Sequence, residues 1–214
     1  MTVAIFDLDY TLLDGDTEAL WSRFLFEKGR VARAFVERIE AYYRDYESGG
    51  LDFRAYEEFL LGSLAALAWD DFLGLREEFL HERISPLIRP PMLEVLGWHR
   101  GQGHTPLLLT ASNHLLVEPI AGLLHIPNCL CTRAEIRDGK CTGRIVGIPA
   151  FQEGKATLLK DWLAAHRHTL EESWAYSDSH NDLPLLNLAA HAVAAYPDAR
   201  LRSVAQSRAW KIIG

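Results

Sequence analysis

The chain has 214 residues, of which 49% are hydrophobic and 24% are charged, and its formal net charge is −7. This composition is ordinary for a soluble globular protein with one full core, or with a core and a smaller inserted module. The acidic balance and the lack of a Lys/Arg run argue against a nucleic-acid-binding role, and no apolar run approaches the roughly 20 residues needed to cross a bilayer.

The amino terminus and the cysteines indicate the compartment. The first residues lead directly into an apolar strand, without the basic segment or the cleavage site of a signal peptide. Cys129, Cys131 and Cys141 are too few and too clustered for the disulfide framework of a secreted protein. We therefore expect a cytoplasmic protein.

An apolar run from Val3 to Phe6 leads straight into Asp7 and Asp9. A short run of this kind, with β-branched residues, predicts a strand buried on both faces, as in a parallel sheet. Because burial of an unpartnered carboxylate is costly, we expect both aspartates at the exit of the strand, and alternation along the strand would turn them to the same side. Two carboxylates this close repel each other, so we expect a bound cation between them, and oxygen ligands suit Mg²⁺. An ordinary acidic turn after a strand is the simpler explanation of these residues alone.

The next 70 residues or so have the pattern of four amphipathic helices without a strand. Asp16 or Thr17 is placed to cap the first helix, which stops at Gly29, and Asp52 is placed to cap the third. We expect a compact helical bundle, with its aromatic residues at core positions. The helices are predicted over residues 16–29, 31–48, 52 to about 64, and 70–84.

From residue 86 onwards, strands and helices alternate, which predicts an α/β fold with a doubly wound, Rossmann-like parallel sheet. We expect residues 1–15 and 86–214 to form this core, and residues 16–85 to form an inserted, all-helical cap beside the ligand-binding end of the sheet. The predicted elements are a helix over 90–101, a strand over 105–110, a helix over 113–125, a strand over 129–132, a hairpin over 137–144, a helix over 154–166, a strand over 174–177, a helix over 181–188, a strand over 191–195 and an edge strand over 212–213.

Three later positions repeat the form of the first strand, an apolar run that ends in polar groups. Thr110 and Ala111 follow an apolar strand and precede a helix, where a hydroxyl and backbone N–H groups suit a phosphate oxygen. Lys155 opens a helix and supplies a point charge for a phosphoryl group. Asp178 and Asp182 follow another strand. Taken singly, each has an ordinary structural explanation as a strand-terminal hydroxyl, a surface lysine or a helix cap.

Taken together, the order and the spacing of these residues resemble the four motifs of the haloacid dehalogenase superfamily of phosphatases. The resemblance covers the whole chain, and the helical segment between the first two motifs is similar to the cap of the phosphoserine phosphatase branch. The sequence Ser177–Leu186 is particularly close to bacterial members of that branch. The motifs correspond to Asp7-Leu8-Asp9-Tyr10-Thr11, to Thr110, to Lys155, and to Asp178 with Asp182.

The resemblance implies a Mg²⁺-dependent phosphoryl transfer in two steps. Asp7 would attack phosphorus to form an aspartyl-phosphate, and Asp9 would protonate the departing alkoxide and then deprotonate the attacking water. Mg²⁺ would be held by Asp7, by the backbone carbonyl of Asp9 and by Asp178, with waters completing the octahedron. Asp182 would act from outside this shell by orienting Lys155 or the waters.

The same resemblance assigns the groups that bind the phosphate. Thr110, the N–H of Ala111 and Lys155 would hold the phosphoryl oxygens while charge redistributes. Asn181 would add an amide hydrogen bond to the substrate or to the nucleophile. The net charge of −7 does not argue against an anionic substrate, because Mg²⁺ and Lys155 set the local field.

The predicted cap supplies the only sequence information on the leaving group. By resemblance to phosphoserine phosphatases, Asp16 falls where an acidic residue binds the substrate amine, and Glu18 is a further contact. Leu60 falls where the family carries an arginine for the substrate carboxylate, although Arg44 or Arg54 is able to substitute from another direction. A substrate with an amine but no carboxylate fits better, and the chain is similar to the histidinol-phosphatase group, whose substrate is histidinol phosphate. Phosphoserine or another small-metabolite phosphate is the alternative.

Two functions of other classes compete with this interpretation. A phosphoaccepting receiver domain uses similar residues around Mg²⁺, but it has no inserted bundle and it places its acidic pair and its phosphoacceptor on different strands. A zinc module built from His125, Cys129, Cys131 and Cys141 lacks the usual Cys-x-x-Cys spacing. The expected partner is a small phosphorylated metabolite, with no nucleic acid and no membrane. The sequence leaves the oligomeric state open, with a monomer favoured.

Overall fold

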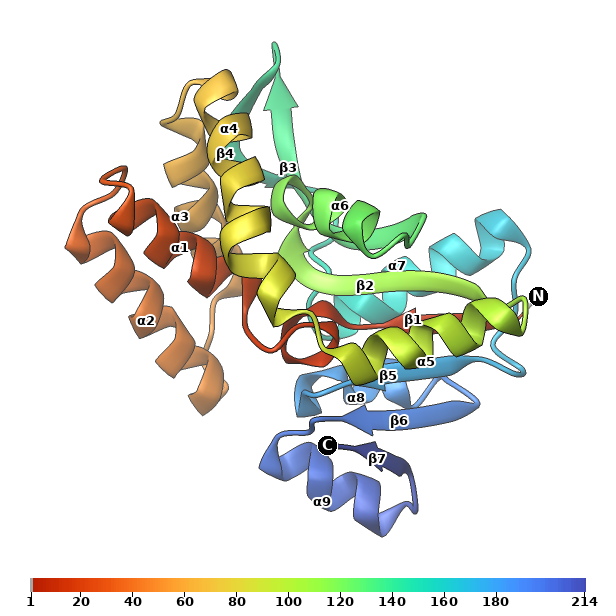
Figure 1. Cartoon of the computed structure of the whole chain (residues 1–214). Helices are drawn as coiled ribbons and strands as arrows, with labels where there is room; N and C mark the ends of the chain where they lie inside the picture. The colour runs from red at the N-terminus through yellow and green to blue at the C-terminus, as the bar shows by residue number, and fades with distance from the viewer. Residues whose placement is uncertain (1) are drawn as a thin grey trace.

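The strand β1 (Val3–Phe6) lies at the centre of the sheet in the computed structural model of the chain, which describes residues 2–214. The sheet has the strand order β4-β3-β2-β1-β5-β6-β7 (Figure 1). Neighbouring strands are parallel except β3 and β4, which form an antiparallel hairpin at one edge. The prediction of a doubly wound α/β sheet is therefore confirmed. The other strands are β2 (Thr105–Asn113), β3 (Asn128–Arg137), β4 (Lys140–Val146), β5 (Trp174–Ser177), β6 (His191–Ala195) and β7 (Lys211–Ile213).

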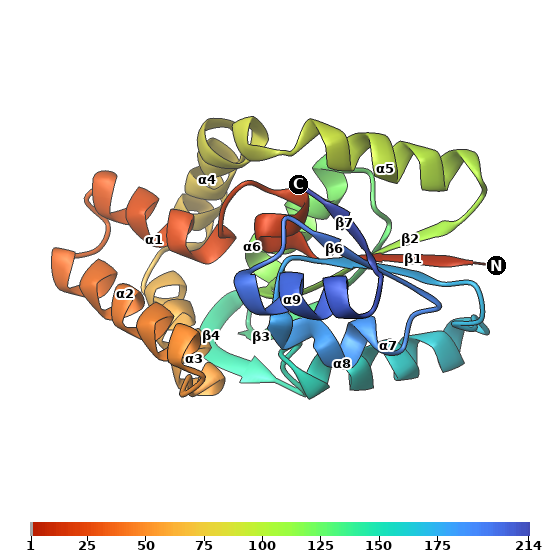
Figure 2. The same cartoon turned by 90° about the horizontal axis from the view of Figure 1, so that it is seen from below.

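Both faces of β1 are buried, as its apolar sequence predicts. Ala4 and Phe6 belong to the core shared with α5 and α6, whereas Val3 and Ile5 belong to the core shared with α7, α8 and α9. Figure 2 shows α5 on one side of the sheet and α7, α8 and α9 on the other. The five helices are α5 (Pro90–Gly101), α6 (His114–Leu123), α7 (Glu153–His166), α8 (Leu183–Leu186) and α9 (Ala199–Ser207).

Four helices between β1 and α5 lie beside one end of the sheet (Figure 1). Asp16 accepts hydrogen bonds from the N–H groups of Glu18 and Ala19 and so caps the first helix, and Asp52 caps the third through the N–H of Ala55. Both predicted caps are thus confirmed. Across residues 2–214, no helix has the length and the apolar character needed to cross a membrane. The four helices are α1 (Thr17–Glu27), α2 (Arg33–Ser48), α3 (Phe53–Ala65) and α4 (Trp69–Phe79).

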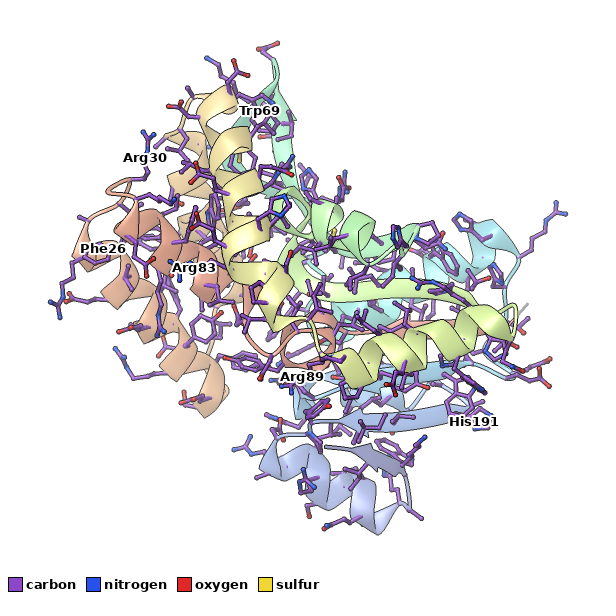
Figure 3. The ribbon with its side chains drawn as sticks, in the orientation of Figure 1. Phe26, Arg30, Trp69, Arg83, Arg89 and His191 are labelled. Carbon is purple, nitrogen blue, oxygen red and sulfur yellow. The ribbon has the colours of Figure 1, made fainter. Side chains whose placement is uncertain are left out.

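The two chain segments that connect the four helices to the sheet run side by side. Leu13 forms an antiparallel bridge with Ile88, and the N–H of Arg89 donates to the carbonyl of Leu12. The guanidinium of Arg89, labelled beside the start of α5 in Figure 3, pairs with Asp14 at 2.7 Å. This pairing fixes the base of the helical segment against the sheet. The domain boundaries themselves stay a prediction.

The first motif differs from the expected geometry. The strand ends at Phe6, and Leu8–Leu12 form a tight π-type turn in which Tyr10 has a φ of 55°. Asp9 therefore lies in this turn rather than on the strand. The expectation that strand alternation turns Asp7 and Asp9 to the same side is wrong, because the strand does not reach Asp9.

Several element ends differ as well. β2 continues to Asn113 rather than ending at Thr110, and β3 continues to Arg137 rather than ending at Thr132, because β3 pairs with β4 beyond the parallel part of the sheet. Sequence analysis missed α9, which begins after Asp198. The apolar positions of this helix span only about one and a half turns, and so short a periodic pattern does not distinguish a helix from a loop.

Gly154 marks a close approach between the start of α7 and the loop before it. A Cβ atom built on Gly154 would lie 1.9 Å from the backbone carbonyl oxygen of Pro149. Backbone cannot move away as a flexible side chain can, so this position admits glycine alone. The close approach also fixes the start of the helix that carries the next residue, Lys155.

We therefore predict that Gly154→Ala lowers the free energy of unfolding by at least about 2 kcal/mol, because the added methyl group is overpacked against backbone. Gly97→Ala is the matched control, since Gly97 is helical and nothing lies within 4 Å of its added Cβ. It should raise stability by about 0.5–1 kcal/mol through helix propensity. Urea unfolding of both variants checks this, and equal effects would contradict it.

Candidate active site

A cavity of about 470 Å³ opens where β1, β2 and β5 end beside α1, α2 and α3. The carboxyl ends of parallel strands are the usual ligand-binding edge of an α/β sheet. Ten residues assigned from the sequence to catalysis, metal binding or substrate binding line this cavity, so the structure brings the four motifs and the two acidic residues of the helical segment together. These residues are Asp7, Asp9, Asp16, Glu18, Thr110, Ala111, Lys155, Asp178, Asn181 and Asp182.

The side chains of Asp7, Lys155, Asp178 and Asp182 form the floor of the cavity. Lys155 lies at its centre. Its Nζ lies 2.7 Å from Oδ1 of Asp7 and 2.7 Å from Oδ2 of Asp182, and all three side chains are buried. Ser177 also donates a hydrogen bond to Asp182 at 2.7 Å. Burial by itself would lower the pKa of Lys155, but Asp182 and Asp7 outweigh it and raise that pKa above its ordinary value. Lys155 is therefore a permanent cation that orients two carboxylates.

Asp7 and Asp178 are brought together by Thr11. The Oγ1 of Thr11 lies 3.3 Å from Oδ2 of Asp7 and 3.2 Å from Oδ1 of Asp178, and it accepts the N–H of Asp178 at 3.0 Å. Burial raises the pKa of Asp7 to about 7, against the opposing effect of Lys155. Burial and the neighbouring charges of Asp7 and Asp182 raise the pKa of Asp178 well above its ordinary value. Sequence analysis did not assign this role to Thr11, although the residue stands within the first motif.

The carboxyl of Asp9 turns toward the helical segment. It accepts hydrogen bonds from the N–H and the hydroxyl of Thr17 at 2.7 and 2.5 Å and from the hydroxyl of Ser112 at 2.7 Å. Burial raises its pKa to about 6, although the bonds from Thr17 and Ser112 work in the opposite direction. Asp9 thus ties the start of α1 to the end of β2. Ser112 was not predicted as a site residue, and its only sequence signal is its place just after Thr110 and Ala111.

The donor set of the floor fits a hard divalent cation. Three carboxylates, those of Asp7, Asp178 and Asp182, face one ammonium, so the floor carries an excess of negative charge. Within residues 2–214, no group of three or more His, Cys, Asp or Glu side chains is placed to hold a metal ion. Two carboxylates completed by backbone oxygen and water match the ligation that Mg²⁺ prefers. The Asp9 carboxyl is engaged by Thr17, so only its backbone carbonyl is left for this purpose.

The wall of the cavity that α1, α2 and α3 provide is acidic and aromatic. Asp16 caps α1 and accepts a hydrogen bond from Tyr43, and burial raises its pKa to about 6. Leu60 is fully buried in the core and does not line the cavity, and neither Arg44 nor Arg54 lines it. The lining residues from this segment are Asp16, Glu18, Tyr42, Tyr43, Tyr46, Glu47, Leu51, Phe53 and Tyr56.

One edge of the cavity is built by His180 of the fourth motif together with Asp198 and Arg200, which sequence analysis did not name. Asp198 accepts hydrogen bonds from the N–H and from Nδ1 of His180, both at 2.8 Å, and its own N–H donates to the carbonyl of Asp178 at 2.7 Å. Arg200 lies 3.2 Å from Nε2 of His180. This edge fixes the loop that carries Asp178, and it was missed because α9 itself was missed.

Comparisons with known proteins agree with this arrangement. The model of the family of haloacid dehalogenase-like hydrolases matches residues 4–187. A histidinol-phosphatase of Neisseria meningitidis is 38% identical, over 99% of this chain and 97% of that protein. A phosphoserine phosphatase of Mycobacterium tuberculosis is 32% identical, over 98% of this chain and 69% of that protein. A solved structure from Bordetella pertussis, described as a protein of unknown function, has a TM-score of 0.93 and 37% identity and covers 100% of this chain and 99% of its own.

The charge balance of the floor yields a stability prediction. Lys155→Met removes the ammonium and leaves Asp7 and Asp182 buried without a cation, which should cost about 3–5 kcal/mol of unfolding free energy at pH values where both are ionised. The loss should shrink as the pH falls, because protonated carboxyls no longer need the ammonium. Urea unfolding as a function of pH measures both effects.

Lys160→Met is the control for this variant, because Lys160 lies on the same helix and is exposed. It should change stability little at any pH. A Lys155→Met protein as stable as the Lys160→Met protein would contradict the role of Lys155 as the central counter-ion.

Proposed function

Because the chain belongs to the haloacid dehalogenase-like hydrolase family, we propose that it is a Mg²⁺-dependent phosphomonoester hydrolase that works through an aspartyl-phosphate. The family match and the named phosphatase relatives confirm the sequence-based predictions of this superfamily and of a phosphatase. The metal, the intermediate, the roles of single residues and the substrate are our proposal. The observation that carries it is the cluster of Asp7, Asp178 and Asp182 around Lys155.

The nucleophile in this proposal is Asp7. Its Oδ1 is held by Lys155 and its Oδ2 receives a hydrogen bond from Thr11, so the carboxylate is oriented before substrate arrives. Attack on phosphorus forms the aspartyl-phosphate and releases the alkoxide of the leaving group. Mg²⁺, when bound near Asp7 and Asp178, would neutralise charge on the phosphoryl oxygens.

Asp9 is the general acid and base. Its raised pKa of about 6 leaves the carboxyl able to give and to take a proton near neutral pH. It protonates the leaving alkoxide and then removes a proton from the water that attacks the aspartyl-phosphate, which releases inorganic phosphate and restores Asp7. The hydrogen bonds from Thr17 and Ser112 hold the carboxyl in one orientation for both steps.

The phosphate is held by groups at the ends of β2 and α7. Thr110, which is buried, and Ala111 lie in the last part of β2, and Lys155 reaches the cavity from the first turn of α7. These donors match the oxygens of a phosphoryl group. Asn181 is held by Gln152 at 3.2 Å, at a position where its amide faces the same space.

The cap wall, which is the side of the cavity that α1, α2 and α3 provide, favours a leaving group that carries a positive charge and a ring. The cavity-lining residues of α1, α2 and α3 include three carboxyl side chains and five aromatic rings, and the basic lining residues, Lys155, His180 and Arg200, all come from the other side. Histidinol phosphate carries an amine and an imidazole, whereas the carboxylate of phosphoserine would face carboxyl groups. This supports histidinol phosphate as the best substrate and no longer depends on Leu60. Phosphoserine is the second candidate, because Arg200 places a guanidinium at the cavity, the one that the residues described by the structure supply there.

The location and the assembly of the protein stay predictions. The composition and the cysteine pattern favour a cytoplasmic protein, and the oligomeric state stays open, with a monomer favoured. No partner other than a small phosphorylated metabolite is proposed.

The test is phosphate release from histidinol phosphate, phosphoserine and simple sugar phosphates in the presence of Mg²⁺. We predict that kcat/KM is highest for histidinol phosphate, and that Asp7→Asn lowers kcat by at least about 10⁴-fold. Asp14→Asn, at an exposed carboxylate that pairs with Arg89, is the control and should keep wild-type turnover.

The two parts of this proposal fail separately. Turnover that survives Asp7→Asn would contradict the aspartyl-phosphate mechanism. Phosphoserine hydrolysis far faster than histidinol phosphate hydrolysis would leave the mechanism intact and contradict the argument from the cap wall.

A further inference from the structure

Two glutamates on different helices meet behind the cap wall. Glu18 on α1 is 3% exposed and lines the cavity, whereas Glu57 on α3 is 0% exposed and lies outside the lining. The two carboxyls are in contact, and Asn113 at the end of β2 lies against both. Glu57 plays no part in the proposed reaction, so its complete burial needs a separate explanation.

The hydrogen bonds at this contact are distributed unequally. Glu18 accepts the N–H of Asn113 at 2.9 Å, its Nδ2 at 2.8 Å, and the hydroxyl of Tyr56 at 2.8 Å. Neither carboxyl oxygen of Glu57 receives a hydrogen bond from a donor, and Oδ1 of Asn113 is also without one. An ionised Glu57 would thus be a buried carboxylate without a well-formed hydrogen bond, next to a second carboxylate, and the nearby Asn113 side chain lowers its pKa less than burial raises it. Such an arrangement is among the most costly in a protein interior.

A proton on Glu57 removes this conflict. A protonated carboxyl has one O–H donor, and the acceptors Glu18 and Asn113 are both in reach. Burial, followed by the charge of Glu18, raises the pKa of Glu57 well above its ordinary value. Burial also raises the pKa of Glu18, but only to about 7, because the hydrogen bonds from Asn113 and Tyr56 stabilise its charged form. The proton of the pair therefore belongs on Glu57.

Among residues 2–214, the titratable groups that act on the two carboxyls are acids, phenols and a thiol, and none of them is a cation that would compensate a second charge. They are Asp9 in the first motif, Asp16 next to α1, Tyr43 on α2, Tyr56 on α3 and Cys131 on β3.

We propose that Glu57 keeps its proton at neutral pH and donates it to Glu18, so that the two carboxyls carry a single negative charge. Glu57 is a positioning residue in this arrangement, because it fixes the charge and the orientation of Glu18 without reaching the cavity. The consequence for catalysis rests on the proposed function, in which Glu18 faces the leaving group. The sharing of the proton itself does not depend on it.

The proposal makes stability depend on pH in a defined direction. The pKa of a free glutamate is 4.5, and the pKa of Glu57 in the folded chain lies well above that. Between these two values the folded chain binds one proton more than the unfolded chain, so stability falls as pH rises. The contribution is complete below the unfolded pKa and is lost as the pH approaches the folded one.

The experiment compares wild type, Glu57→Gln and Glu58→Gln by urea unfolding at about pH 5.5, 7 and 8.5. Glutamine keeps the shape and a donor for Glu18 but has no proton to lose. Relative to wild type, the folding equilibrium constant of Glu57→Gln should rise with pH, by about tenfold per pH unit at pH values between the unfolded and the folded pKa of Glu57. Glu58→Gln is the control, because Glu58 is the next residue, partly exposed and paired with Arg54. It should show a constant difference from wild type.

A spectroscopic readout separates proton sharing from a merely structural role. The infrared difference spectrum of wild type minus Glu57→Gln at pH 7 should contain the carbonyl stretch of a protonated carboxylic acid, and the difference spectrum with Glu58→Gln should not. A missing band, or a Glu57→Gln protein whose stability follows pH in parallel with wild type, would overturn the proposal. A Glu57→Gln protein that fails to fold at pH 7 would overturn it as well, since a neutral isostere with a donor must be accepted.

An activity measurement then tests the link to the leaving group. With an amine-bearing phosphate ester at pH 7, Glu57→Gln should keep kcat and KM close to wild type, because Glu18 keeps its charge and its donor. A large rise in KM in Glu57→Gln would overturn the claim that a neutral donor is what Glu18 needs. If wild type hydrolyses no phosphate ester, the proposed function fails while unfolding and infrared results still decide the proton sharing.

Discussion

The balance between three carboxylates, of which Asp7 and Asp182 are buried and Asp178 is half-buried, and one buried ammonium is the constraint on which the rest of the site depends. Asp7, Asp178 and Asp182 meet at the carboxyl edge of the sheet, and Lys155 compensates only part of their charge. A parallel sheet brings these residues together as a consequence of its topology, because the carboxyl ends of its strands lie at one edge. The remaining negative charge makes the floor a place for a divalent cation and, through it, for a phosphate.

The helical segment completes the site from the opposite side. It adds acidic and aromatic side chains but no basic one to the described lining, so the two walls select different parts of a substrate. The floor matches an anionic phosphoryl group, and the cap wall matches a cationic leaving group with a ring. The segment is anchored to the floor by polar contacts, with Asp9 binding Thr17 and Glu18 binding Asn113. The same contacts place several carboxyls in a small buried volume, where sharing a proton lowers the free-energy cost of burying them.

Much of the fold and of the floor was predictable from sequence, since both follow from local patterns. The apolar run before Asp7, the caps Asp16 and Asp52, and the alternation of strands and helices predicted the sheet and the four helices, and the order of the motifs predicted the floor residues. The turn that carries Asp9 was not predictable, because Tyr10 adopts a left-handed backbone conformation that the local sequence does not indicate. Glu57 has the sequence signature of an exposed helical residue, and only tertiary packing reveals that it is buried against Glu18. The extension of β2 and β3 likewise depends on pairing between strands, of Asn113 with Thr132 and of the end of β3 with β4, which local propensity does not specify.

The central claim is that Asp7 and Asp178 share a divalent cation at the floor of the cavity, and calorimetric titration with Mg²⁺ tests it most directly. The account predicts binding to wild type at one site, and a loss of affinity of at least about tenfold in Asp178→Asn. Asp14→Asn should bind as wild type does, because Asp14 is exposed and pairs with Arg89 away from the floor. Equal Mg²⁺ affinity in wild type and Asp178→Asn would contradict the account.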